Sequence, residues 1–328
     1  MSSILSSNQS ARGTAEGAYE RGEPWFDDGN VILQAESRRF RVYRGALALN
    51  SPVFASSFPR NRAPQVPSST AVYRLQDRPV DLQHFLTAIF VPGYYEKKLR
   101  KDYDATISIL RLSTKYQVQY FRQDIIAQLV LAYPTTLAGW DKRSKLQLYP
   151  PNAAKRAVDI VRLARENNIR ALLPAALYQC CENPLEVILD GIPQPDSTPT
   201  RLSAEDEEIC ILGRERIVEA FRSRLFSERQ LVSSGPGFLA SRHVPCDSAR
   251  LRWLYKDDIW EMAFGYDWFK LLQKECPTLG PGVCPTCQKA FVATFERARA
   301  LIWENLPGYF GLPDWSVLRA ELDEILKE

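Results

Sequence analysis

The spacing of apolar residues predicts strands early in the chain and helices after them. In the early part, apolar and polar residues alternate or gather in short runs, and the segments that predict strands are 31–35, 39–42 and 72–75. Ser51 and Pro52 pair a helix-capping side chain with a proline suited to the first helical turn, which predicts one of two short helices within 45–58. Residues 1–22 have little to bury and predict a disordered tail.

Helical periodicity dominates from Pro79 onward. One predicted helix begins at Pro79, another has Asp104 as its N-cap, and a third begins with a capping box at Ser203. The other predicted helices cover 121–129, 154–167, 170–181, 291–302 and 315–325. Prolines in 191–200 predict an irregular connector. The fold class expected is therefore α+β, with a mixed domain over 23–133 followed by an all-α domain over 134–328.

Composition and charge narrow the classes of function. The chain has 328 residues, with 42 Lys and Arg against 39 Asp and Glu, and the two signs are interleaved. This balance gives no basis for direct nucleic-acid binding. The charge-free stretch 125–140 is broken by Pro134 and is too short to span a membrane, and the N-terminus lacks a secretory signal pattern. We therefore expect an intracellular protein without a membrane span.

Catalytic chemistry has little support in the sequence. The chain has two histidines, His84 and His243, and neither belongs to a nucleophile, zinc-protease, phosphate-loop or dinucleotide motif. His84 is expected to be a partly exposed structural residue. The sequence predicts that the protein is not an enzyme.

The cysteines carry the sharpest chemical pattern. Two thiols two residues apart, Cys284 and Cys287, have the spacing of half a zinc site. His243 and Cys246 have the same gap and are candidates for the other half, with Cys276 as a spare ligand. The alternatives are a redox dithiol and structural thiols in the core. The sequence predicts no other cofactor.

Two further cysteines, Cys180 and Cys181, are adjacent in a predicted helix. Side chains of neighbouring residues on a helix point in different directions, so these two are not expected to bridge each other. We expect both to be thiols in the core of the helical part.

The predicted order of elements resembles the BTB/POZ domain. The segments that carry the resemblance are WFDDGNVIL (25–33), FRVYRGAL (40–47), SPVF (51–54) with Phe58, and LRLSTKY (110–116). The later segments LPAALY (173–178), LGRER (212–216) and 303–315 are similar to the C-terminal half of fungal BTB-domain proteins. That group implies no particular activity.

The resemblance implies a homodimer. By analogy with the family, Leu47, Val53, Phe54 and Phe58 are expected near the dimer seam. For Phe54, a place in the core of a single chain is an equal alternative.

Two departures from the family pattern limit what is carried over. Asn30 and Tyr43 stand where most BTB domains have aspartate and histidine. The hydrophobic-x-acid motif of many cullin-binding members is Ala105-Thr106-Ile107 here and lacks the acid, so a cullin scaffold is possible as a partner but unsupported.

The leading hypothesis is a protein–protein interaction scaffold that dimerises and presents a helical region to unidentified protein partners. The alternative is a zinc-stabilised transcriptional or chromatin regulator acting through protein partners.

Overall fold

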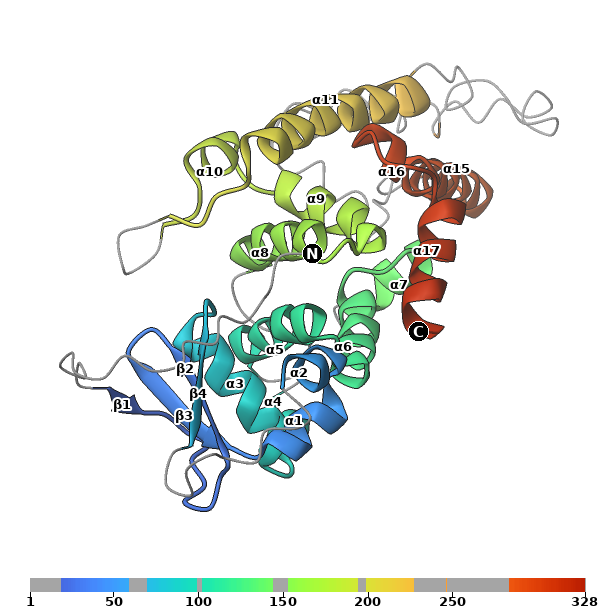
Figure 1. Ribbon diagram of the computed structural model, residues 1–328. Coiled ribbons are helices and arrows are strands. Elements are labelled where there is room, and N and C mark those ends of the chain that lie inside the picture. The colour runs from blue at the N-terminus through green and yellow to red at the C-terminus, as the bar shows by residue number, and fades with distance from the viewer. Residues whose placement is uncertain are drawn as a thin grey trace. The chain divides into compact units, whose positions relative to one another are not determined.

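The computed structural model describes residues 19–58, 70–98, 102–143, 153–193, 199–226, 246 and 283–327 (Figure 1). These residues form two compact units that divide between Gln128 and Leu129, inside helix α6 (Gln119–Ala132). The predicted domain boundary at residue 133 lies shortly after that point. The first unit holds a four-stranded sheet and helices, and the second is built mainly of helices, so the α+β class is confirmed at this level.

The sheet has the strand order β1-β3-β2-β4. Its strands are β1 (Glu20–Arg21), β2 (Val31–Ala35), β3 (Arg38–Val42) and β4 (Ala71–Leu75). The predicted hairpin is confirmed by the antiparallel β2–β3 pair, and the predicted third strand is β4, which runs parallel to β2. The prediction of a disordered tail through residue 22 is wrong for its last residues, because β1 pairs with β3 through backbone hydrogen bonds.

Helices cover one face of this sheet (Figure 1). They are α1 (Arg44–Asn50), α2 (Pro52–Ser57), α3 (Pro79–Phe90), α4 (Tyr94–Lys98) and α5 (Tyr103–Tyr116). The two predicted short helices are α1 and α2, and Ser51 caps α2 by accepting a hydrogen bond from the Phe54 amide. The prediction that Asp104 caps α5 is wrong. Asp102 is the cap, because its side chain accepts the hydrogen bond from the Ala105 amide.

Three of the four residues expected at a dimer seam lie in the core of this unit. Leu47 and Phe54 are fully buried and Phe58 is 3% exposed. The Phe54 ring stacks on Tyr116, with 4.4 Å between the ring centroids. Leu47 and Phe58 therefore have no surface for a second copy, contrary to the prediction, and Phe54 takes the core position that was its alternative, whereas Val53 is half-buried.

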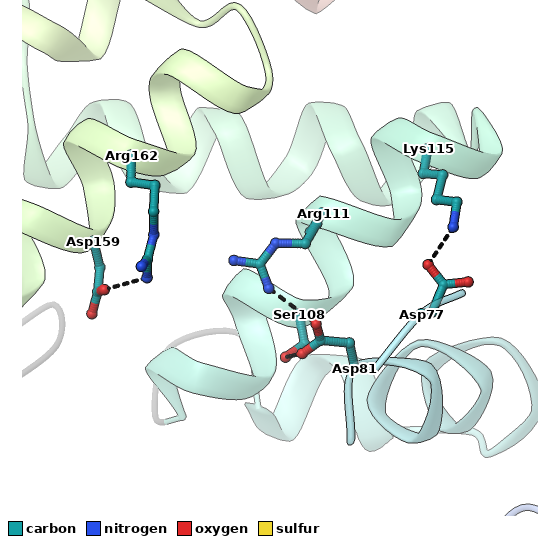
Figure 2. A network of polar contacts seen from close by, with 7 residues as sticks. All are labelled: Asp77, Asp81, Ser108, Arg111, Lys115, Asp159 and Arg162. Atoms are coloured by element: carbon teal, nitrogen blue, oxygen red, sulfur yellow. Dashed lines mark hydrogen bonds and ion pairs between the residues drawn. The ribbon is translucent and has the colours of Figure 1, made fainter. Parts of the chain in front are cut away.

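A buried acid, Asp77, ties the end of α5 to the segment after β4. Lys115 forms an ion pair with Asp77 at 2.5 Å (Figure 2). The Tyr116 hydroxyl donates to the second Asp77 oxygen. Burial, together with the Asp77 charge, raises the pKa of Tyr116 well above its usual value. The Lys-Tyr pair that marks the resemblance at residues 115–116 therefore closes a contact across the unit.

A second buried acid, Asp81, does the same one turn earlier on α5. It accepts hydrogen bonds from Ser108 at 2.7 Å and from Arg111 at 3.0 Å (Figure 2). Asp81 stands in the first turn of α3, so the contact joins α3 to α5. Each of the two acids is thus matched by a cation and a hydroxyl.

The helices of the second unit follow the predicted periodicity. They are α7 (Leu137–Lys142), α8 (Ala153–Glu166), η2 (Arg170–Leu172), α9 (Leu173–Cys181), α10 (Leu185–Asp190), α11 (Ala204–Phe226), α15 (Pro285–Glu304), α16 (Leu306–Tyr309) and α17 (Trp315–Lys327). The predicted end of α8 is confirmed by the left-handed backbone of Asn168, and the predicted cap of α11 by the Ser203–Asp206 hydrogen bonds. Helices α7, α10 and α16 were not predicted, because each is too short to show a period.

Tryptophans build the core of the second unit. Trp303 packs against Trp140 and Trp315, with ring centroids 5.2 Å and 5.8 Å away. Gly213 allows the Phe310 ring to pack closely on α11, because a Cβ atom at this position would stand 2.3 Å from the ring. The segments 212–216 and 303–315, which share the resemblance, are therefore in contact.

None of the helices that the structure describes is long and apolar enough to cross a membrane.

Candidate metal centre

Three cysteine thiols lie together at the start of α15. The Sγ atoms of Cys246, Cys284 and Cys287 are all within 4.8 Å of one another. Cys246 and Cys287 are buried and Cys284 is half-buried. The six cysteines that fall within the described residues form no disulfide bond. The fold thus brings the Cys246 thiol next to the thiols of Cys284 and Cys287, although Cys246 is far from them in the sequence.

The local sequence explains how two of these thiols are placed. Cys284 is the N-cap of α15, and Pro285 occupies the first helical position, where a missing N–H costs nothing. The Cys284 sulfur accepts a hydrogen bond from the Cys287 amide at 3.4 Å, so both thiols lie at the end of the helix where backbone amides point outward.

The third thiol is tied in by the backbone. The Cys284 amide donates to the Cys246 sulfur at 3.3 Å. Amide donors and the positive end of a helix both favour the thiolate over the thiol. The thiolate is the form that binds a metal ion.

The spacing of the sulfur atoms fits a tetrahedral ion. With Zn–S bonds of about 2.3 Å, two ligands of a tetrahedral zinc stand about 3.8 Å apart. The observed upper limit of 4.8 Å therefore leaves at most about 1 Å of closure for each pair. Thiolate ligands without carboxylates select zinc or another soft ion over magnesium or calcium.

The cluster is joined to the core of its unit through α15. Cys287 begins a buried stripe that continues with Phe291, Phe295, Ala298 and Ile302. The predicted amphipathic helix over 291–302 is thereby confirmed, and Cys287, a candidate metal ligand, lies on its buried face. A metal bound at this end would anchor the helix whose other end carries Trp303.

The structure brings together three of the four predicted ligands. His243 and the spare ligand Cys276 lie outside the described residues. The pairing of the 284–287 thiols with Cys246 was visible in the sequence, because the two pairs share the same gap. The amide donors to sulfur were not, since they depend on the backbone path between the two segments.

The remaining thiols form a separate buried group between α9 and α11. Cys180 and Cys181 are in the core, as predicted, and the Cys181 thiol donates to the carbonyl of Cys210 at 3.4 Å. Burial raises the pKa of Cys181. The contact with Cys210 was missed by the sequence analysis because it joins helices that are far apart along the chain.

His84 is held by a neighbouring helix. Its Nδ1 atom is 2.5 Å from the Tyr94 hydroxyl, and the side chain is half-buried. The expected structural role for this histidine fits that contact.

No family model, curated protein or solved structure matches this chain. The resemblance to the BTB/POZ domain rests on the residues quoted above.

Proposed function

We propose that this chain is a non-catalytic protein-interaction scaffold whose helical unit is stabilised by a zinc ion bound to Cys246, Cys284 and Cys287. The observation that supports the proposal is the group of three sulfur atoms within 4.8 Å of one another, two of which accept backbone hydrogen bonds. Four-coordinate closed sites are typical of structural zinc. His243 is the proposed fourth ligand, and Cys276 is the alternative.

The third thiol favours a metal over a redox dithiol. Cys284 and Cys287 alone would suit either chemistry, because thiols at a helix N-terminus are stabilised as thiolates. A dithiol–disulfide pair needs only two sulfur atoms. The Cys246 sulfur is a third one within 4.8 Å of both others, and it accepts a hydrogen bond from the Cys284 amide. A metal ion uses all three.

The first unit is proposed to be the interaction module of the BTB/POZ type. Support comes from its order of elements and from the Lys115–Asp77 contact, which gives the quoted LRLSTKY segment a structural role. We propose that it forms a homodimer through the surface of α1 and α2. Val53 keeps part of its surface there, and Leu49 on α1 is 87% exposed.

The zinc proposal is tested by the metal content of the purified full-length chain and of two matched variants. Cys287→Ala removes a ligand, and Cys181→Ala removes a buried thiol outside the cluster. Elemental analysis should find one zinc per chain in the wild type and in Cys181→Ala, and a strongly reduced content in Cys287→Ala. Equal zinc in both variants, or none in the wild type, would overturn the proposal.

The dimer is tested by sedimentation velocity over a range of concentrations. Leu49→Asp places a charge on α1, and Leu212→Asp is a matched control on α11, where the leucine is 43% exposed. The wild type and the Leu212 variant should sediment as dimers and the Leu49 variant as a monomer. A wild-type monomer at every concentration would contradict the dimer.

A further inference from the structure

The face of the sheet opposite the helices is lined by arginines. Strand alternation puts seven positions on that face: Arg21, Ile32, Gln34, Arg39, Arg41, Val72 and Arg74. Four of these are arginine and none is acidic. The helices pack on the other face, which carries Val31, Leu33, Phe40 and Val42. Arg38 points to the helix side, where it bonds to Gln83 of α3.

The strand register puts three of these arginines in one row. Arg21 is paired with Arg39, Arg39 with Gln34, and Gln34 with Arg74. Neighbouring strands are about 4.8 Å apart, so the row from the first to the fourth strand spans about 14 Å. Like charges on directly paired positions, here Arg21 and Arg39, destabilise a sheet, and a bound anion would offset the repulsion. The exposed Asp27 carboxylate, 4.0 Å from Arg21, offsets it only in part.

The guanidinium groups keep donors available. Arg39 uses its Nε atom on the Gln34 side chain at 2.9 Å, and Arg41 uses its Nε atom on the Gly29 carbonyl at 2.8 Å. Among the described residues, the terminal nitrogens of Arg39 and Arg41 have no hydrogen-bond or ion-pair partner, and neither has the Arg74 side chain. Guanidinium forks match a carboxylate with two parallel hydrogen bonds.

The neutral positions on the face distinguish between classes of anion. Ile32 and Val72 are half-buried aliphatic side chains beside Arg41. The aromatic rings nearby are already occupied by arginines, with Tyr19 under Arg39 at 4.2 Å and Trp25 under Arg21 at 5.0 Å. Single-stranded nucleic acid binds by stacking its bases on exposed rings, and this face does not offer them. Carboxylates alternating with apolar side chains fit it better.

We propose that the outward face of the sheet, defined by Arg21, Arg39, Arg41 and Arg74 with Ile32 and Val72, binds an extended acidic peptide segment of a partner protein. Carboxylates of the peptide pair with the arginine forks, and apolar residues between them rest on the two aliphatic side chains. The inference rests on the proposed scaffold function, for which it names the chemistry of the partner. The zinc content and the oligomeric state are measured without the peptide, so either proposal can fail alone.

The test is a titration of the full-length chain with a fluorescent peptide of about eight residues in which Glu and Val alternate, which covers roughly 27 Å when extended. Fluorescence anisotropy reports binding, and a Lys-Val peptide and a thymidine oligonucleotide of similar length serve as competing probes. We expect saturable binding of the Glu-Val peptide below about 1 mM, weakened by added salt. No binding at that concentration would overturn the proposal, as would tighter binding of the oligonucleotide.

Charge-reversal variants locate the site. Arg39→Glu with Arg74→Glu should weaken the peptide by about tenfold or more, whereas the matched control Lys97→Glu with Arg297→Glu, at exposed positions off this face, should change it by less than about twofold. If the first variant unfolds, Arg39→Gln with Arg74→Gln replaces it, since glutamine keeps a hydrogen-bonding side chain. Equal weakening by the face and control variants would show attraction to net charge alone and would overturn the assignment.

Discussion

Both units join sequence-distant segments through ion pairs of buried charged groups, and the second unit adds a cluster of thiols. In the first unit the buried acids Asp77 and Asp81 each have a cation and a hydroxyl as partners. In the second unit the buried acid Asp206 likewise has a cation, Arg165, and a hydroxyl, Ser203, as partners. This unit also holds the Cys246–Cys284–Cys287 thiol cluster, and Glu182, which has one buried carboxyl oxygen without a hydrogen-bond partner among the described residues. We propose that these two features make the second unit sensitive to a bound metal ion and to pH.

One ion pair of the second unit, between residues three apart on α8, is more exposed to solvent than the pairs that Asp77 and Asp81 form in the first unit. Asp159 and Arg162 on α8 are 2.8 Å apart, and the arginine side chain is 53% exposed (Figure 2). The Asp159 side chain is 11% exposed, but solvent reaches the arginine and screens the pair, so it contributes less than a pair that is shielded on both sides. Removing one partner is therefore expected to cost more for Asp77 and Asp81 than for this pair.

The largest effect is expected from Asp77→Ala. The substitution leaves the buried Tyr116 hydroxyl and the Lys115 ammonium without their acceptor, and we expect a loss of about 3–4 kcal/mol in the free energy of unfolding. Urea unfolding followed by circular dichroism measures it. Asp27→Ala is the control, because Asp27 is 92% exposed and 4.0 Å from its nearest cation. A loss equal to that of the control would show that the buried pair does not hold the unit.

A smaller effect is expected from pH in the second unit. Burial raises the pKa of Glu182 to about 7, although the Arg143 charge opposes the shift. Since the folded state then holds this proton more tightly than the unfolded state, stability falls as the pH rises from the ordinary glutamate value through about 7. The Glu182 contribution lost between pH 5 and 8 is about 2–3 kcal/mol.

The measurement is the difference in unfolding free energy between the wild type and Glu182→Gln at both pH values. The variant lacks the titrating group, so the wild type should lose stability relative to it as the pH rises. A difference that stays constant from pH 5 to pH 8 would contradict the assignment.

The smallest effect is expected at the surface of α17. Arg170 of η2 donates to Glu321 with an Nε–Oε2 distance of 3.0 Å, and both side chains are partly exposed, at 40% and 31%. Glu321→Ala should cost about 0.5 kcal/mol, because the pair is screened by solvent. Thermal unfolding of this variant beside Glu324→Ala, which is an exposed residue on the same helix, gives the value. A loss as large as that of Asp77→Ala would erase the contrast between buried and exposed pairs.

The sequence predicts those elements whose apolar residues recur with a regular period. Helices α3, α5, α8, α11, α15 and α17 and the β2–β3 hairpin show a clear period, and each was expected. Strand β1 was not, because two residues carry no period and their pairing with β3 is parallel and distant. Leu47 and Phe58 were expected at a dimer seam and lie in the core for a related reason, since a pattern shows which side chains are apolar but not whether core or partner covers them.

The candidate sites divide in the same way. The matched gaps of the cysteine pairs predicted three thiols that the structure brings together. The arginine face needed the strand register, because Arg21, Arg39 and Arg74 come from three separate segments. Asp77 and Asp81 were also missed, since their partners lie on α5, far along the chain.

The central claim is that the second unit is built around a bound metal ion, and a native mass spectrum of the purified full-length chain tests it most directly. The account predicts that each chain carries the added mass of one zinc ion and that Cys287→Ala loses it. A metal-free wild-type chain, whether monomer or dimer, would contradict the account and leave Cys246, Cys284 and Cys287 as packing residues.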